Sequence, residues 1–205
     1  MKTEATKPYH HGDLRNALII AAAQLISESG SLEFAMIDAA RRAGVSNAAP
    51  YRHFKDKDAL LTAVAELGFL ELRGRIDRTM NAHVSGTREA IIAHGKTYIQ
   101  FLLEHPAFYS LMWGERASDE PEDSQKIRTS GFYSVVEAIE TWCSARELSA
   151  PNPEDVAIKL WAMCHGLTVL AMHHQIDRFS DKVQVYDLAE ASANTFLDGL
   201  EHNAL

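Results

Sequence analysis

Residues 35–58 have the sequence AMIDAARRAGVSNAAPYRHFKDKD, and this stretch decides the fold. Small apolar residues recur at helical spacing up to Ala43, which predicts a short helix with a narrow buried side. Gly44 follows at once, and glycine readily adopts the left-handed conformation that ends a helix. Pro50 suits the first turn of a second helix, because the N–H groups of that turn have no intrahelical partner. The stretch therefore predicts a helix, a glycine turn and a second short helix, which is the order of a helix-turn-helix.

The two helices of this motif are expected over 36–43 and 47–54, with the hydroxyl of Ser46 capping the second. In a helix-turn-helix the second helix lies in the DNA major groove. The segments RRAGVS and YRHF, followed by Lys57, resemble the DNA-binding signature of the TetR family of transcriptional regulators over residues 41–57. The alternative, a helical hairpin without a DNA partner, is disfavoured because all three features occur together.

The resemblance implies which residues contact DNA. Tyr51 and His53 match positions that commonly donate to phosphates in the family, and Lys57 begins a helix whose N-terminus favours anions. At the start of the second helix, asparagine can pair with adenine and an alanine methyl group can contact that of thymine. Arg52 could reach a phosphate or a guanine, or be merely solvated, whereas Phe54 is expected to pack in the core. The expected DNA-binding residues are Ser46, Asn47, Ala48, Ala49, Tyr51, Arg52, His53 and Lys57.

Two positions depart from the family pattern. The family often has serine or threonine where this chain has Ala35, and a polar residue where it has Ile37. Alanine cannot accept the capping hydrogen bond, a loss of about 1 kcal/mol of helix stability. The first helix is therefore expected mainly to support the second. These departures are also the only sequence support for an alternative function, an all-α small-molecule-binding protein or enzyme that keeps a vestigial helix-turn-helix.

The charge of the chain is divided unevenly. With 20 Lys and Arg against 28 Asp and Glu, the formal net charge is −8, which argues at first against a nucleic-acid partner. Residues 1–60 hold eight basic and seven acidic residues, whereas the remainder holds 12 and 21. Because phosphate contact is local, the basic residues around the helix-turn-helix suffice for DNA binding.

The composition, with 46% apolar and 23% charged residues, is typical of a soluble globular protein, and we expect a cytoplasmic one. No uninterrupted apolar run reaches the roughly 18 residues that a membrane span requires. The first residues, MKTEATKPYHHGD, lack the apolar core of a secretory signal. Cys143 and Cys164 lie far apart and in no CxxC motif, which favours buried thiols in a reducing cytoplasm over a redox switch.

The expected fold class is all-α, with about nine helices, since no run alternates apolar and polar residues as a half-buried strand would. We expect residues 1–56 to form the DNA-binding domain and residues 57–205 to form a C-terminal effector-binding and dimerisation domain. The helix over 154–175 is apolar almost all round, so it must be buried by its own domain and by another subunit. The other helices are expected over 13–29 with Asp13 as its cap, 57–80, 88–104 with Thr87 as its cap, 107–113, 127–146 and 182–200, with an exposed loop over 115–124.

The C-terminal part carries a second resemblance. In WAMCHGLTVL, Trp161, His165 and Gly166 look like the WHG motif in the C-terminal domain of one TetR branch, and FLLEHPAFYSLMW at 101–113 also resembles that branch. The family uses this domain for small-molecule effectors. Core packing is the alternative for each aromatic residue, and a structural hydrogen-bonded role is the alternative for His165. The expected ligand-binding residues are Phe101, Phe108, Met112, Trp113, Tyr133, Trp161 and His165.

Together these patterns predict a homodimeric, ligand-responsive repressor that a small-molecule effector releases from a palindromic operator. The last two helices would form an isologous four-helix interface, and the two recognition helices would enter successive major grooves roughly 34 Å apart. The expected partners are double-stranded operator DNA, the effector and a second copy of the chain, and no membrane. The sequence has no HExxH, GxSxG, glycine-rich phosphate loop or paired-cysteine motif, so we expect no catalytic residues, no cofactor and no metal.

Overall fold

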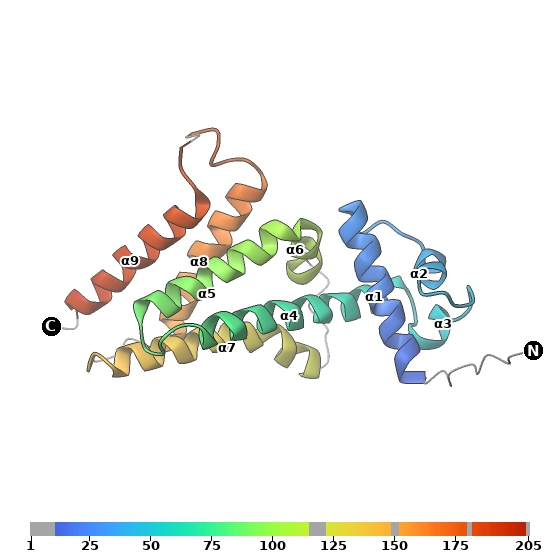
Figure 1. The fold of residues 1–205 in the computed structure, drawn as a ribbon, viewed down its shortest axis with the longest axis horizontal. Helices are drawn as coiled ribbons and strands as arrows, with labels where there is room; N and C mark the ends of the chain where they lie inside the picture. The colour runs from blue at the N-terminus through green and yellow to red at the C-terminus, as the bar shows by residue number, and fades with distance from the viewer. Residues whose placement is uncertain (1–10, 115–121, 149–151, 180–181, 204–205) are drawn as a thin grey trace, which may run out of the picture. The chain divides into compact units, whose positions relative to one another are not determined.

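A computed structural model describes residues 11–114, 122–148, 152–179 and 182–203, and these residues are largely helical (Figure 1). They contain no strand, and the prediction of an all-α fold is confirmed. Within the described ranges the helices are α1 His11–Ser29, α2 Met36–Arg42, α3 Pro50–His53, α4 Lys57–Asn81, α5 Arg88–Glu104, α6 Pro106–Trp113, α7 Glu122–Ser144, α8 Pro153–Met172 and α9 Val185–Asn203.

The chain divides into two compact units. Unit 1 comprises residues 1–68 and 107–118, and unit 2 comprises residues 69–106 and 119–205. The division falls inside α4, after Gly68, so α1, α2 and α3 share unit 1 with most of α6. The predicted division of function, with DNA binding in residues 1–56 and effector binding in residues 57–205, stays a prediction.

Unit 1 is built around a core that α1 shares with the helix-turn-helix. Leu18 and Ile26 of α1 and Ala39 of α2 have no exposed surface. The small side chain of Ala39 lets α2 lie close to α1, and the two helices are in contact. Phe54, which follows α3, packs into the same core with 4% of its surface exposed, as predicted. This packing holds the short α3 in place, because a four-residue helix has little stability of its own.

The turn between α2 and α3 has the conformation that the sequence predicts. Gly44 has φ +70°, in the left-handed region. Its N–H donates to the carbonyl of Arg41 at 3.2 Å, and the N–H of Val45 donates to that of Ala40 at 3.0 Å. These two bonds form a Schellman motif, which satisfies carbonyls at the end of α2. Val45 is half-buried against the core and so anchors the turn.

The second helix of the motif is shorter than predicted. The α-helical residues are Pro50–His53, and the preceding residues form a turn in which the N–H of Ala49 donates to the carbonyl of Ser46 at 2.9 Å. Pro50 has no N–H to bond a carbonyl four residues earlier, so the regular helix begins there. The predicted cap is also wrong, because the N-cap is Ala49 and no side chain caps the helix.

Other predicted boundaries are also wrong by a few residues: α8 ends at Met172 and not at 175, and α9 spans Val185–Asn203 and not 182–200. Helix α1 is described from His11, two residues before its predicted start, and the side chain of Asp13, the predicted cap, lies outside what the structure describes. Helix α7 begins at Glu122, before the predicted start at Ile127. Acidic residues near a helix N-terminus are favourable, and Glu122 also pairs with Lys126 one turn later at 2.9 Å. The predicted loop over 115–124 therefore ends sooner, and its residues 115–121 lie outside the described residues.

Unit 2 surrounds α5 with α7, α8 and α9, each of which contacts it (Figure 1). Ile139 and Trp142 of α7, Val156 of α8 and Leu197 of α9 form its core and have no exposed surface. Helix α5 begins at the predicted cap, where the hydroxyl of Thr87 accepts from the N–H of Ala90 at 3.3 Å.

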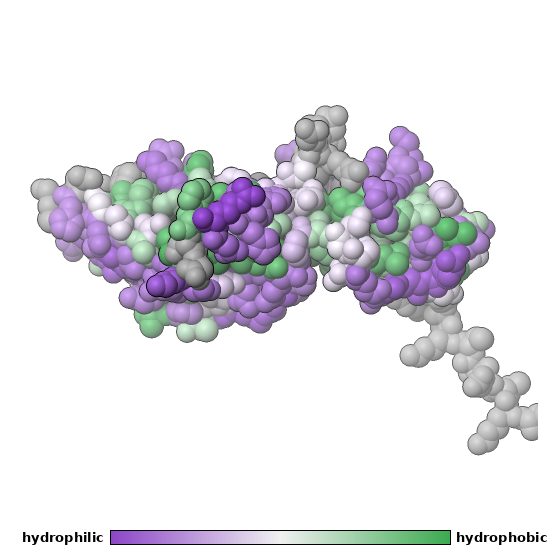
Figure 2. Space-filling view, turned by 90° about the horizontal axis from the view of Figure 1, so that it is seen from above, coloured by the Kyte–Doolittle hydropathy of each residue, from purple (hydrophilic) through white to green (hydrophobic). Residues whose placement is uncertain are grey.

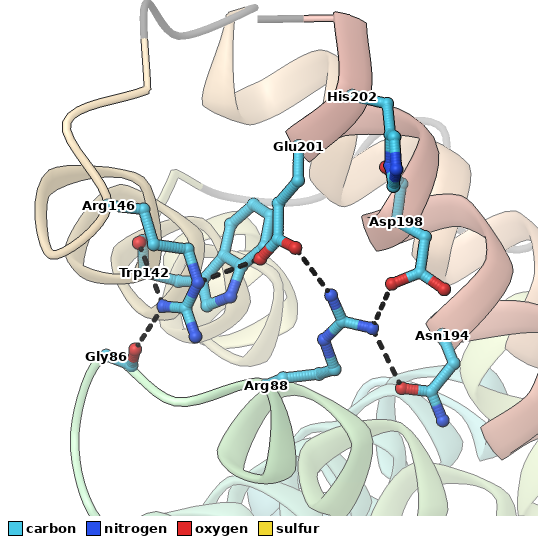
Figure 3. Close-up of polar contacts among 8 residues, drawn as sticks. All are labelled: Gly86, Arg88, Trp142, Arg146, Asn194, Asp198, Glu201 and His202. Carbon is cyan, nitrogen blue, oxygen red and sulfur yellow. Dashed lines mark hydrogen bonds and ion pairs between the residues drawn. The ribbon is translucent and has the colours of Figure 1, made fainter. Parts of the chain in front are cut away.

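Two arginines tie the C-terminal helix α9 to α5 and α7 (Figure 3). Arg88 of α5 donates to Glu201 at 3.0 Å and to Asn194 at 3.3 Å, and it pairs with Asp198. Hydrogen bonding by Asp198 is the main reason why the pKa of Arg88 lies above its ordinary value. Arg146, after α7, donates to the other oxygen of Glu201 at 2.9 Å. Glu201 therefore lies between two guanidinium groups and joins three segments of unit 2.

Glu201→Gln is expected to lower the free energy of unfolding by about 1 kcal/mol, because the amide offers one acceptor oxygen to two cationic donors. Asp198→Asn is the matched control. The Asp198 side chain is more exposed and, among the described residues, pairs with one arginine, Arg88, so its replacement is expected to have a smaller effect. Urea unfolding followed by circular dichroism measures both. An equal or larger effect of Asp198→Asn would contradict the central position of Glu201.

Helix α8 is only partly covered within the chain. Its buried residues are Val156, Ala157, Leu160 and Thr168, whereas Ile158 is 50% and Leu170 46% exposed. By length and composition alone, α8 is the one helix in the described segments that could cross a membrane, a test that core helices also pass. Hydrophobic and hydrophilic patches alternate over the face that Figure 2 displays. Helix α8 is predicted by the sequence to be buried on several sides, but its own chain buries only one side of it. Its burial by a second subunit stays a prediction.

Candidate DNA-binding face and candidate effector site

The helix-turn-helix presents a small exposed surface, called here the reading face. It consists of Ser46, Asn47 and Ala48 in the turn and Tyr51 and Arg52 in α3, all exposed to solvent. The side chain of Tyr51 is the clearest example, with 62% of its surface exposed although it is a large aromatic residue. His53 is half-buried. A phenol, a guanidinium, an amide and a hydroxyl are all groups that donate hydrogen bonds to phosphate oxygens.

Ala49 does not belong to the reading face. It is only 6% exposed, so its methyl group packs inside unit 1 and is not available to a thymine methyl group. Nothing in the sequence distinguishes Ala48 from Ala49, because they are identical neighbouring residues. The hydrogen bonding of the turn determines which of the two points outward, since it rotates the chain before α3 begins.

Lys57 lies at the first residue of α4, as predicted. Its ammonium group lies 4.8 Å from the centre of the Phe34 ring and 4.0 Å from a carboxylate oxygen of Glu33. The carboxylate of Asp56 already accepts from the N–H of Ala59 at 2.8 Å and caps the helix. An incoming phosphate would therefore compete with two carboxylates for Lys57 and for the helix N-terminus.

The first helix of the motif compensates for its missing cap. Ala35 makes no side-chain bond, but its N–H donates to the carboxylate of Asp38 at 3.0 Å. Arg42 forms a two-bonded ion pair with Glu28 of α1, so it is engaged inside unit 1. Arg41 is 72% exposed and bonds only Asp38, at 3.3 Å, among the described residues. Helix α2 thus mainly supports α3, and Arg41 is its exposed cation.

The predicted ligand-binding residues fall into two groups. Phe108, Met112 and Trp113 belong to unit 1, where α6 lies so close to Gly68 that a Cβ there would be 2.9 Å from Phe108 and from Met112. The remaining four belong to unit 2: Phe101 is buried, His165 is half-buried, Trp161 is 39% exposed and Tyr133 is 56% exposed. Neither unit by itself brings all seven residues together.

Unit 2 joins some of these residues to others that sequence reasoning missed. The hydroxyl of Tyr98 in α5 lies 2.7 Å from Nδ1 of His165 in α8. The His165 ring packs edge-on against Trp161, with ring centres 5.6 Å apart, and Trp161 packs against Phe132 of α7 at 6.4 Å. One turn before Tyr98, His94 is 7% exposed, and its Nε2 has no hydrogen-bond partner among the described residues. The helical spacing of His94 and Tyr98 was the available signal.

Burial dominates the chemistry of the titratable groups here. It lowers the pKa of His94 to about 4, against the opposing effect of the nearby Gly131 carbonyl, so the imidazole is neutral at pH 7. Burial likewise lowers the pKa of His165. It raises the pKa of the Cys164 thiol to about 11, which keeps the reactive thiolate scarce. Burial also raises the pKa of Cys143, which is buried as expected, whereas Cys164 is only half-buried.

The free energy of unfolding is expected to fall by about 2–3 kcal/mol between pH 7 and pH 4.5 because of His94. In the unfolded chain a histidine gains a proton near pH 6.5, whereas the folded protein resists this until about pH 4. The contribution of the neutral His94 imidazole to the free energy of unfolding is therefore fully present above pH 6.5. It is lost as the pH falls toward 4. Urea unfolding across this range tests it, with His94→Leu as the variant that removes this part of the dependence. Identical pH profiles for the two proteins would contradict it.

Family models match both parts of the chain. Residues 18–64 match the family of bacterial regulatory proteins, tetR family, and residues 91–193 match the tetracyclin repressor-like C-terminal domain. No curated protein sequence matches the chain.

Solved structures share this fold over most of the length of the chain. A protein with unknown function from Rhodococcus sp. RHA1 is 29% identical, with a TM-score of 0.79 over 96% of this chain and 100% of that one. The TetR family transcriptional regulator PfmR from Thermus thermophilus is 17% identical, with a TM-score of 0.62 over 88% and 97%. The transcriptional regulator FadR from Bacillus subtilis, solved with stearoyl-CoA, is 16% identical, with a TM-score of 0.66 over 90% and 98%. The C-terminal match alone spans half of the residues, and the helix-turn-helix matches as well. The chain therefore belongs to the TetR family of transcriptional regulators.

Proposed function

We propose that this regulator is a homodimeric, ligand-responsive repressor that leaves a near-palindromic operator when a small-molecule effector binds. The observation that carries the proposal is the reading face, where Asn47, Ala48, Tyr51 and Arg52 are exposed on a turn and helix held by the core of unit 1. Asn47 and Ala48 contact base edges, and Tyr51, Arg52, His53 and Lys57 contact the phosphates. Ser46, exposed beside them, can donate to a further phosphate.

The dimer uses α8 and α9 of each subunit in a four-helix interface. The exposed apolar side chains of α8 support this arrangement, because a face of that kind is ordinarily covered in a soluble regulator. A two-fold axis would place the two reading faces in successive major grooves roughly 34 Å apart, and the operator would then be near-palindromic. The double-stranded operator, the effector and the second subunit are thus the three partners.

The effector binds in the C-terminal part, and α4 carries the signal to the reading face. FadR from Bacillus subtilis, whose fold this chain shares, was solved with stearoyl-CoA, which supports a small-molecule site in this architecture. The dimer has two states, one with its reading faces correctly spaced for the operator and one with them wrongly spaced. An effector that binds the second state more tightly lowers the operator affinity. The coupling free energy equals the difference between its binding free energies for the two states, about 1–3 kcal/mol.

A gel-shift titration with the DNA upstream of the chain's own gene tests the first step. The wild-type protein is expected to retard this DNA specifically and less strongly as salt rises. Tyr51→Ala combined with Lys57→Ala is expected to weaken binding about a hundredfold, because two phosphate contacts are lost. Phe179→Ala, which removes an exposed aromatic residue from unit 2, is the control and should bind like the wild type. Equal binding by the double variant and the wild type would contradict the proposal.

A further inference from the structure

Two buried side-chain nitrogens of unit 2 have no hydrogen-bond partner among the described residues, Nε1 of Trp142 and Nε2 of His94, and of the two His94 is the titratable group. It lies in the middle of α5 with 7% of its surface exposed, and its Nε2 has no hydrogen-bond partner in the described part of the chain. A buried polar atom without a partner destabilises the fold, so such an atom usually has a partner of another kind, such as a water or a ligand. Its neighbours therefore indicate what that partner is.

A connected set of aromatic side chains contacts α5 through Tyr98. Tyr98 lies one helical turn after His94 on the same face, and its hydroxyl lies 2.7 Å from Nδ1 of His165. Trp161 packs edge-on against His165 and against Phe132, so side chains from α5, α7 and α8 form a connected set. We call His94, Tyr98, Phe132, Trp161 and His165 the aromatic cluster. Trp161 is 39% exposed, so the cluster reaches the surface of unit 2.

The charges next to His94 are already neutralised. Arg73 of α4 donates to the carboxylate of Asp77 at 2.7 Å and to the carbonyl of Ser130 at 2.7 Å. His94 itself is neutral at pH 7, since burial holds its pKa near 4. A ligand bearing a net charge would lose its hydration without gaining an opposite charge, which is costly. The cluster therefore suits an uncharged ligand with flat apolar surfaces.

We propose that the aromatic cluster binds a neutral aromatic molecule that carries a hydroxyl group, with the hydroxyl bonded to His94 and the ring against Trp161 and Phe132. A hydroxyl group both donates and accepts, so it satisfies Nε2 whichever ring nitrogen carries the proton. Aromatic ligands also match the edge-on geometry already present between Trp161 and its neighbours. The inference deepens the proposed function, on which it rests, by naming the chemical class of the effector.

Isothermal titration of the full-length protein with three matched probes tests this assignment. 4-Propylphenol carries the hydroxyl, propylbenzene lacks it and 4-propylbenzoate replaces it with a charge. We expect 4-propylphenol to bind at least tenfold more tightly than either of the others. His94→Leu, which removes the polar atom from an apolar site, is expected to fold and to abolish this preference. Phe179→Ala is the control, because Phe179 is 91% exposed on a loop of unit 2 and should leave the preference unchanged.

The following results would overturn the assignment. The first is the absence of 4-propylphenol binding, and the second is equal affinity for 4-propylphenol and propylbenzene. The third is an unchanged preference in a folded His94→Leu protein, which would mean that the partner of Nε2 is a structural water. Tighter binding of 4-propylbenzoate would replace the neutral ligand with an anionic one and equally contradict the proposal. Gel shifts with the same preparation separate the two hypotheses. Operator binding without a phenol preference refutes only the ligand class, whereas loss of operator binding in the wild type refutes the proposed function.

Discussion

Ile158→Asp is expected to leave the protein monomeric and to abolish its specific retention of operator DNA. Ile158 is 50% exposed on α8, on the part of the helix that its own chain leaves uncovered. In an isologous interface one substitution places two carboxylates in the contact, and burying each without a partner costs several kcal/mol. The proposed repressor binds its operator with two reading faces held together in a dimer. A monomer therefore loses specific operator binding. The effect is therefore expected to be all-or-none at micromolar protein concentration.

Sedimentation equilibrium and gel shifts with the same preparation measure this result. Leu70→Asp is the matched control, because Leu70 is 52% exposed on α4 and its replacement adds the same charge in unit 2. That variant should remain dimeric and bind DNA. A dimer that survives Ile158→Asp, with unchanged operator affinity, would place the interface elsewhere on the chain.

Trp142→Ala is expected to lower the free energy of unfolding by about 3–5 kcal/mol, a large part of the roughly 5–15 kcal/mol that holds a domain folded. Trp142 has no exposed surface and is among the largest fully buried side chains in the described residues. It packs in the core of unit 2, and the guanidinium of Arg146 lies 4.9 Å from its ring centre. Alanine would leave a large cavity and remove this cation–π contact.

Urea unfolding at a fixed protein concentration, followed by circular dichroism, measures the loss. Trp142→Phe is the informative control. Nε1 of Trp142 is buried without a hydrogen-bond partner among the described residues, so phenylalanine removes an unsatisfied donor while it fills most of the space. We expect this variant to lose much less stability than the alanine variant. Equal losses in the two variants would show that the indole nitrogen, and not the packed volume, is what matters.

The helix-turn-helix could be predicted in most of its details because its determinants are local. Gly44 ends α2 in the left-handed conformation, Phe54 is buried, and Lys57 begins α4, all as the residue types and their spacing indicate. The end of α2 and the start of α4 depend on hydrogen bonds within a few residues, whereas Phe54 is apolar and packs in the core that α1 shares with the motif. The family resemblance drew on the same short segment, and the match to the regulatory family over residues 18–64 agrees with it.

The candidate effector site was less predictable. Its members come from α5, α7 and α8, which are far apart in the chain, so the pairing of Tyr98 with His165 has no local signature. His94 looked like one residue of an ordinary helix, and only its burial without a partner singles it out. In the same way, the seven aromatic, methionine and histidine residues predicted from the motifs and the family resemblance divide between two units, because a motif does not say which neighbour covers a side chain.

By itself, the sequence determined the all-α class, the positions of the helices to within a few residues, and the motif that assigns the chain to its family. Helical periodicity and capping act over one or two turns, so they can be recognised in the sequence. Only the tertiary structure decided that Ala49 is buried while Ala48 is exposed, that α8 keeps an uncovered apolar side, and that Glu201 joins Arg88 to Arg146. Those outcomes depend on which distant segments pack together, and packing is a property of the whole fold.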